Sequence, residues 1–330
     1  MGSINRDKEL RKYIKYLGIV VLLIILSKID VSKLWQVILN INIFYLLIAI
    51  SLNIPQLFLK SLRWNKLLYV QGINYPKTTS FLTYISSLYI GFVTPGRLGE
   101  FLKAVYLKSD KGISLSKGMS SVLADRLFDL YLLIILGIIG IWKFDILGKL
   151  SSTSLFLLFI LILSPLVVLN KQLMVRVVGL IYKFIIKKKA ELRDKIEERF
   201  EDFYNGINQL ITWKLIFSAF LTCLSYLIFF IQCYLIAIAM GISINFITIT
   251  LFMAISNLIS FIPISISGLG TRDATLIYLF SLIDLNPELA VSYAFLVFIT
   301  FFVCGGLMGA VAWWINPFDI DKTFRKCGNN

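Results

Sequence analysis

Several apolar runs in this chain are long enough to cross a lipid bilayer. One of them reads YLGIVVLLIILSKI at residues 16–29, and others of similar character follow along the chain. A hydrocarbon layer of ~30 Å is crossed by roughly 20 helical residues. The runs are continuous and not alternating, which favours helices over strands. With 58% hydrophobic and only 16% charged residues, the sequence predicts an all-α, polytopic integral membrane protein.

The hydropathy pattern predicts about six full spans. They lie at about 13–29, 43–60, 119–142, 152–169, 213–240 and 290–315. Two further apolar stretches, 79–95 and 247–266, each end in proline and glycine and are followed by another partly apolar piece. These two stretches need a different explanation from a simple crossing.

The basic residues predict the orientation of the spans, because cytoplasmic loops of membrane proteins are enriched in Lys and Arg. The segments on both sides of residues 79–95 are basic, so both belong in the cytoplasm and the stretch between them enters and returns as a re-entrant hairpin. The same reasoning makes 247–266 with 273–283 a second hairpin, entering from the outside. We expect a multi-pass protein of the cell (plasma) membrane with both termini cytoplasmic.

The two hairpins resemble each other in sequence. ISSLYIGFVTPGRLGEFLKAVYL (85–107) and ISNLISFIPISISGLGTRDATLIYL (255–279) share an order of IS, Leu, Phe, Pro, a glycine-rich break and an Arg with an acid. Similar segments that enter from opposite faces indicate an inverted-topology repeat, which in transporters places the substrate site between the repeats. We predict one membrane domain over 1–330, with halves at about 1–169 and 213–330.

Residues 170–212 form a charged segment between these halves. Apolar residues recur in it at helical spacing, at Ile196, Phe200, Phe203, Ile207 and Leu210. This spacing predicts an amphipathic helix lying on the inner leaflet. Docking of the segment to a partner protein is the alternative.

The first hairpin break provides a candidate anion site. Pro95, Gly96 and Gly99 interrupt the helix, and broken backbone at membrane depth must face protein or water. A short helix from Arg97 to Tyr106 would direct free amides at an anion, with Arg97 and Lys103 adding positive charge and Glu100 orienting Arg97 or accepting a proton. The alternative is a turn at the interface with snorkelling basic side chains.

Three charged residues inside the predicted span 119–142 also need partners. Asp125, Arg126 and Asp129 lie where a charge costs roughly 2.5–3.5 kcal/mol on insertion scales. Arg126 can reach Asp129 three residues on, and Arg97 is an obvious partner for the remaining carboxylate. A purely structural ion pair is the competing interpretation.

The second break repeats the arrangement of the first. Pro263, Gly268 and Gly270 precede Arg272 and Asp273. Taken alone, these residues predict an external loop. Together with the first hairpin, they predict a second mouth of one pathway.

The motifs TPGRLGE, DRLFDL and PISISGLGTRD, in this order, resemble the lysylphosphatidylglycerol synthase transmembrane-region family of flippase-like membrane proteins. The resemblance covers nearly the whole chain and implies movement of a modified phospholipid between leaflets, beside cell-envelope or glycosylation enzymes. Its motif positions are Pro95, Gly96, Arg97, Gly99, Glu100, Asp125, Arg126, Gly268, Gly270, Arg272 and Asp273. Asp273 stands where the family pattern leads us to expect Glu. The chain ends shortly after its last span, so we expect no soluble aminoacyltransferase domain and no lipid aminoacylation.

Composition narrows the functional classes. The chain has no histidine, its four cysteines form no CxxC motif, and no nucleotide-binding or metal-ligand motif is evident. We therefore expect no enzyme, no cofactor and no metal, and we attribute the net charge of +14 to membrane orientation and anionic lipid, not to nucleic acid. The predicted function is movement of an anionic phospholipid or a polyprenyl-phosphate-linked glycolipid. The alternatives are a non-transporting subunit that binds lipid or recruits a cell-envelope or glycosylation enzyme and, with less support, a lipid-modifying enzyme.

Overall fold

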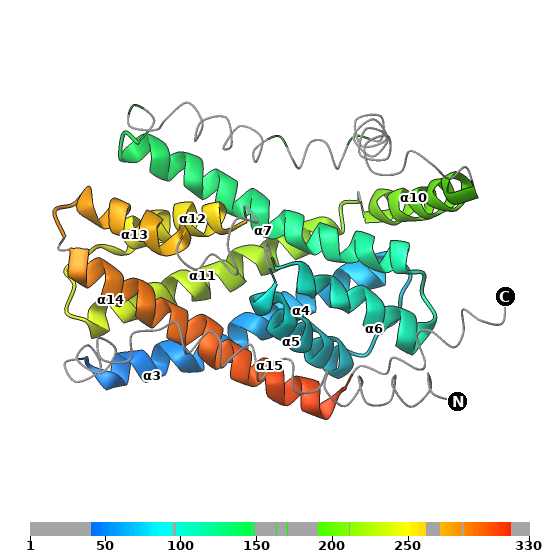
Figure 1. Cartoon of the computed structure of the whole chain (residues 1–330), viewed down its shortest axis with the longest axis horizontal. Coiled ribbons are helices and arrows are strands. Elements are labelled where there is room, and N and C mark those ends of the chain that lie inside the picture. The colour runs from blue at the N-terminus through cyan, green and yellow to red at the C-terminus, as the bar shows by residue number, and fades with distance from the viewer. Residues whose placement is uncertain are drawn as a thin grey trace. The chain divides into compact units, whose positions relative to one another are not determined.

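The computed structural model describes residues 41–94, 97–146, 148, 163, 170, 191–210, 212–261, 271–285 and 287–317. All regular secondary structure in these ranges is helical (Figure 1), as predicted. The α-helices are α3 (Ile43–Ser51), α4 (Asn53–Val70), α5 (Lys77–Val93), α6 (Leu102–Lys111), α7 (Leu115–Lys143), α10 (Glu191–Leu210), α11 (Leu215–Ala239), α12 (Phe246–Ser260), α13 (Thr271–Ser281), α14 (Pro287–Phe298) and α15 (Cys304–Ile315). A 3₁₀-helix, η1 (Leu98–Phe101), precedes α6, and a π-helix, η3 (Ile299–Val303), joins α14 to α15.

Three helical stretches among the described residues are long and apolar enough to cross a membrane. They are Ile43–Val70, Leu215–Ala239 and Leu289–Ile315, and they agree with the predicted spans 43–60, 213–240 and 290–315. At the predicted span 119–142 the chain forms the 29-residue helix α7, whose first half contains the three charged residues. The predicted spans 13–29 and 152–169 lie outside the described residues.

The helix ends follow local sequence signals. An asparagine or serine side chain accepts a backbone N–H at the start of three helices, which satisfies an amide that has no partner inside the helix. These residues are Asn42 before α3, Ser114 before α7 and Asn245 before α12. Glycines with positive φ follow the ends of α4, α6 and α11, at Gly72, Gly112 and Gly241.

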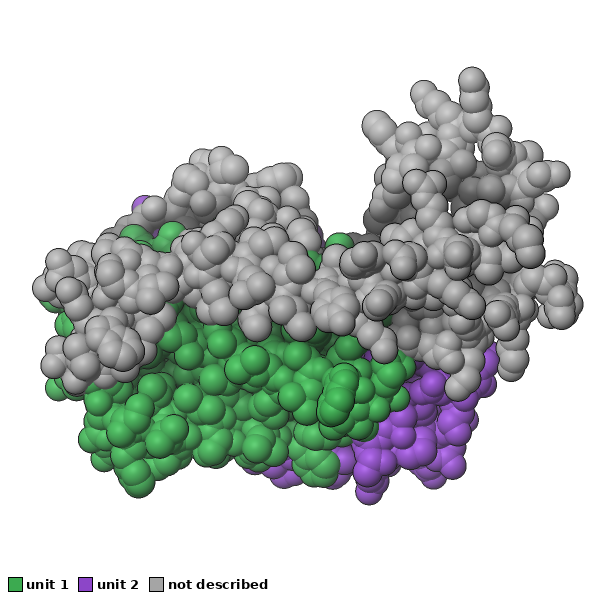
Figure 2. All heavy atoms as spheres, turned by 60° about the horizontal axis from the view of Figure 1, so that its bottom comes forward, with its two compact units in different colours: residues 1–58, 81–102, 225–318 green, residues 59–80, 103–224, 319–330 purple. Residues whose placement is uncertain are grey.

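The chain divides into two compact units (Figure 2). Unit 1 comprises residues 1–58, 81–102 and 225–318, and unit 2 comprises residues 59–80, 103–224 and 319–330. Each unit combines segments from both predicted halves of the chain. The predicted single membrane domain over 1–330, with halves at about 1–169 and 213–330, stays a prediction.

Unit 1 contains the helical hairpin formed by α12 and α13. The rings of Phe252 and Phe280 lie 5.8 Å apart, and the Ser256 hydroxyl donates to the Arg272 carbonyl at 3.1 Å. α13 also packs against α14 (Figure 1), where the rings of Phe280 and Tyr293 lie 5.2 Å apart. The chain thus reverses between α12 and α13 as the second hairpin requires, while entry of this hairpin into the membrane stays a prediction.

Unit 2 contains α10 packed along α7. The Gln71 amide nitrogen, just after α4, donates to the Ser120 hydroxyl on α7 and to the Gly206 carbonyl on α10, each at 2.9 Å. Ile207 and Leu210 are buried. The predicted helix is formed and protein covers these two residues, while its placement on the inner leaflet stays a prediction.

Candidate functional site

The first hairpin break is a tight turn that Thr94 organises. Its hydroxyl accepts the Gly99 N–H at 2.7 Å and donates to the Gly91 carbonyl at 3.1 Å. A Cβ added to Gly99 would lie 2.5 Å from the carbonyl carbon and oxygen of Ile90, so only glycine fits this close to α5. Pro95 and Gly96, the other two predicted breaks, lie outside the described residues.

Two of the described backbone amides of this turn are bonded within the chain. Gly99 N–H is bonded to Thr94, and Glu100 N–H donates to the Arg97 carbonyl at 3.1 Å. A four-residue 3₁₀-helix, and not an α-helix from Arg97, follows the break. These two amides are therefore not open to an anion, whereas the Arg97 side chain still supplies positive charge at this break. The Glu100 side chain is buried beside Gly91, where an added Cβ would lie 2.9 Å from its Cγ.

Arg97 and Arg272 both contact the ring of Phe302. The Cζ atom of Arg97 lies 5.5 Å from the ring centroid of Phe302 and 5.8 Å from that of Phe92. The Cζ atom of Arg272 lies 5.0 Å from the Phe302 centroid. Guanidinium groups at these distances interact favourably with an aromatic ring. The arginines predicted from the two hairpins therefore meet at one aromatic side chain.

Arg272 is held at the start of α13 by polar contacts. It is buried, and its Nε and Nη2 atoms donate to Asp273 Oδ1 at 3.1 and 2.8 Å. Asp273 thus balances the positive charge of Arg272. Pro263, Gly268 and Gly270, the predicted breaks of this hairpin, lie outside the described residues.

Three phenylalanines complete this group. The Phe302 ring stacks on Phe298 at 5.3 Å and lies 4.9 Å from the ring of Phe92. We call Arg97, Arg272, Phe92, Phe298 and Phe302 the arginine–phenylalanine site. Sequence reasoning missed the phenylalanines, since nothing distinguishes them from other aromatic residues in apolar runs.

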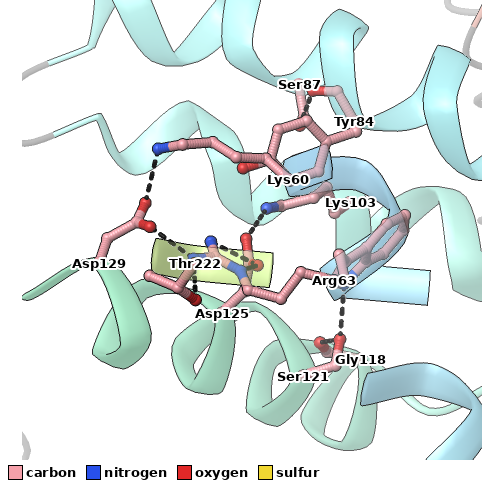
Figure 3. Close-up of polar contacts among 11 residues, drawn as sticks. Lys60, Arg63, Tyr84, Ser87, Lys103, Gly118, Ser121, Asp125, Asp129 and Thr222 are labelled. Carbon is pink, nitrogen blue, oxygen red and sulfur yellow. Dashed lines mark hydrogen bonds and ion pairs between the residues drawn. The ribbon is translucent and has the colours of Figure 1, made fainter. Parts of the chain in front are cut away.

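A second group of charged residues lies in unit 2 (Figure 3). Arg63, fully buried, donates from Nε to Asp125 Oδ1 at 2.8 Å and from Nη1 to Asp129 Oδ1 at 2.6 Å. Lys103 donates to Asp125 Oδ2 at 2.9 Å, and Lys60 donates to Asp129 Oδ2 at 3.1 Å. We call these five residues the charge cluster. It connects α4, α6 and α7, and Arg63 adds α11 through a 3.0 Å hydrogen bond to the Thr222 hydroxyl.

The charge cluster adds partners for the carboxylates to those predicted from the sequence. Asp129 forms ion pairs with Lys60 and Arg63, and the half-buried Arg126 on its own helix adds an electrostatic attraction. Asp125 forms ion pairs with Arg63 and Lys103. The one signal in the sequence for these partners is that Lys60 and Arg63, at the end of a predicted span, are three residues apart and so lie on one face of a helix.

The predicted binding residues therefore divide between the two units. Arg97, Glu100, Arg272 and Asp273 belong to unit 1, whereas Lys103, Asp125, Arg126 and Asp129 belong to unit 2. Lys103 was predicted to face a headgroup, but it is fully buried and also lies 5.5 Å from the Trp64 ring. Its contacts are those of a structural ion pair. The arginine–phenylalanine site is the better candidate for an anion, because guanidinium groups bind phosphate with two parallel hydrogen bonds.

Comparison with known proteins supports a membrane role. The family model described as the lysylphosphatidylglycerol synthase TM region matches residues 14–309. A UPF0104 membrane protein of Methanocaldococcus jannaschii is 26% identical over 91% of this chain and 93% of its own length. UPF0104 membrane proteins of Methanothermobacter thermautotrophicus and Pyrococcus horikoshii are each 24% identical over 92% of this chain, and over 93% and 96% of their own lengths. No solved structure shows significant similarity.

Proposed function

The chain belongs to the lysylphosphatidylglycerol synthase transmembrane-region family, and from this premise we propose that it moves an anionic lipid between the leaflets of the cell membrane. The lipid is a phospholipid or a polyprenyl-phosphate-linked glycolipid, and no covalent step is assigned to the protein. The observation that carries the proposal is the meeting of Arg97 and Arg272 at Phe302. Phe302 lies in a stretch apolar enough to cross the membrane, so the phosphate would be bound while the lipid tails stay in the bilayer.

The burial of the arginines supports an anionic ligand. Arg272 is 2% exposed and Arg97 is half-buried. An anion bound beside both guanidinium groups would add to the compensation that Asp273 already provides for Arg272. A zwitterionic or neutral headgroup would compensate them less well.

The proposed inverted repeat predicts a topology that thiol labelling can test. In a chain whose four cysteines are replaced by alanine, Lys111→Cys should react with a membrane-impermeant maleimide only from the cytoplasmic side, because it follows the first hairpin. Asn286→Cys should react only from the outside, because it follows the second. Intact and opened cells provide the two conditions. Labelling of both positions from the same side would rule out the inverted repeat and, with it, two hairpins entering from opposite faces.

Leaflet exchange in liposomes tests the function directly. The full chain should accelerate exchange of labelled phosphatidylglycerol or labelled polyprenyl phosphate, and Arg97→Ala should slow that exchange at least tenfold, since a charge-assisted hydrogen bond contributes about 1.5–3 kcal/mol. Lys77→Ala is a matched control, because this exposed lysine begins α5, the helix that ends just before the break that contains Arg97. Unchanged exchange in folded Arg97→Ala protein would remove Arg97 from the proposed site.

The same preparations separate transport from binding alone. If the protein binds lipid through Arg97 but does not accelerate exchange, it acts as a lipid-binding subunit. In that case partner recruitment through residues 170–212 would be tested next. The packing of Ile207 and Leu210 in unit 2 leaves less of the apolar face of α10 for such a partner.

A further inference from the structure

The π-helix Ile299–Val303 interrupts the last membrane stretch at the arginine–phenylalanine site. A π-helical turn is wider than an α-helical turn, is rare, and is frequent at functional sites. Asn53 stabilises it: its side-chain amide nitrogen donates to the Thr300 carbonyl at 2.8 Å and to the Ile50 carbonyl at 3.0 Å. Asn53 and Thr300 are both buried, so loss of this hydrogen bond would leave the Asn53 amide and the Thr300 carbonyl out of reach of water as a replacement partner.

The wide turn determines the direction of Phe302. One residue of an α-helix corresponds to a rotation of roughly 100°, so closing the turn to α-helical geometry would change which side chains face the two arginines. In the observed geometry Phe302 stacks on Phe298 with an interplanar angle of 15°, and Arg97 and Arg272 both contact its ring. The distance between the two Cζ atoms therefore cannot exceed the sum of 5.5 and 5.0 Å.

We propose that Phe302, positioned by the π-helix and Asn53, holds Arg97 and Arg272 so that both bind the same phosphate at once. This inference rests on the proposed function. It replaces two separate openings of the pathway, one at each arginine, by one headgroup site that both arginines share. The electron-rich ring stabilises two nearby cations before the ligand arrives, and the phosphate then accepts hydrogen bonds from both. Phe302 and Asn53 are positioning residues: they act by holding other groups in place and do not themselves bind the phosphate.

Binding stoichiometry tests the shared site. The full-length protein in detergent is titrated with short-chain phosphatidylglycerol, and calorimetry should find a single binding event per chain. Arg97→Ala and Arg272→Ala should each weaken the affinity roughly tenfold without changing the stoichiometry. Two bound molecules per chain, with each variant removing only one of them, would overturn the proposal. One bound molecule that depends on only one arginine would overturn it too.

The role of Phe302 needs a readout that a folding defect would not produce. Phe302→Leu should weaken the affinity for the lipid several-fold, whereas Phe302→Tyr, which keeps the ring, should retain it. Because Phe302 acts through the arginines, the effect of Phe302→Leu should be smaller when Arg97→Ala is also present. Phe301→Leu is the matched control: its ring contacts Phe229 at 4.8 Å and should not affect binding. Asn53→Ala, which leaves the site residues unchanged, should reproduce the loss seen in Phe302→Leu.

The outcomes for the two proposals can be told apart. If the wild-type protein binds no phosphatidylglycerol and no polyprenyl phosphate, the proposed function fails. A second outcome is that the wild-type protein binds lipid and both arginine variants weaken binding, but Phe302→Leu weakens the affinity equally in the wild-type and Arg97→Ala backgrounds. In that case the headgroup site stands and the positioning role of Phe302 is wrong.

Discussion

Asp125→Asn is expected to lower the free energy of unfolding by about 3–5 kcal/mol, because it removes one partner from a buried ion-pair network. Asp125 is 1% exposed and accepts hydrogen bonds from both Arg63 and Lys103. Asparagine has nearly the same shape, so the change removes charge without leaving a cavity. A large drop in the thermal unfolding midpoint of the purified protein in detergent would be the direct result.

The charge balance of the cluster provides the control for this prediction. Arg63→Met should be less destabilising than Asp125→Asn, because Lys103 remains on Asp125 and Lys60 remains on Asp129. Lys103→Met should partly rescue Asp125→Asn, since the pair of changes removes one positive and one negative charge. If Asp125→Asn unfolds at the wild-type temperature, the cluster does not stabilise the fold in the way proposed.

The parts of the fold that the sequence predicted are those that local patterns determine. Apolar length alone predicted spans at 43–60, 213–240 and 290–315, which agree with the helical stretches Ile43–Val70, Leu215–Ala239 and Leu289–Ile315. Gly99 in the sequence predicted a tight turn, and in the structure this position has no room for a Cβ. The parallel between the two breaks singled out Arg97 and Arg272 before their common contact with Phe302 was known.

The remaining features depend on residues far apart in the chain. Arg63 and Asp125 are separated by 62 positions, and any of several basic residues could have paired with that carboxylate. The π-helix depends on a hydrogen bond between Asn53 and Thr300, 247 positions apart. No periodicity in the sequence records such contacts, which is why Lys60, Arg63 and Phe302 were missed.

Arg97→Gly is expected to slow lipid exchange at least tenfold without destabilising the turn. Arg97 has φ 55° and ψ 35°, in the left-handed region, where a residue with a Cβ is disfavoured by roughly 1–2 kcal/mol. Glycine adopts this conformation without that penalty, whereas alanine retains it. Strain at a position that a smaller residue would relieve suggests that the guanidinium, and not the backbone, is the reason for arginine here.

Comparing Arg97→Gly with Arg97→Ala separates the two contributions. Both should slow exchange at least tenfold, because both lose the charge and the contact with Phe302. The glycine variant should nevertheless unfold at a higher temperature than the alanine variant, by the equivalent of about 1 kcal/mol, although glycine also gives the unfolded chain more freedom. Arg97→Lys should keep part of the exchange, since it preserves the charge but not the planar fork. If the glycine variant exchanged lipid as fast as the wild type, the turn itself and not the Arg97 side chain would be the functional element of this hairpin.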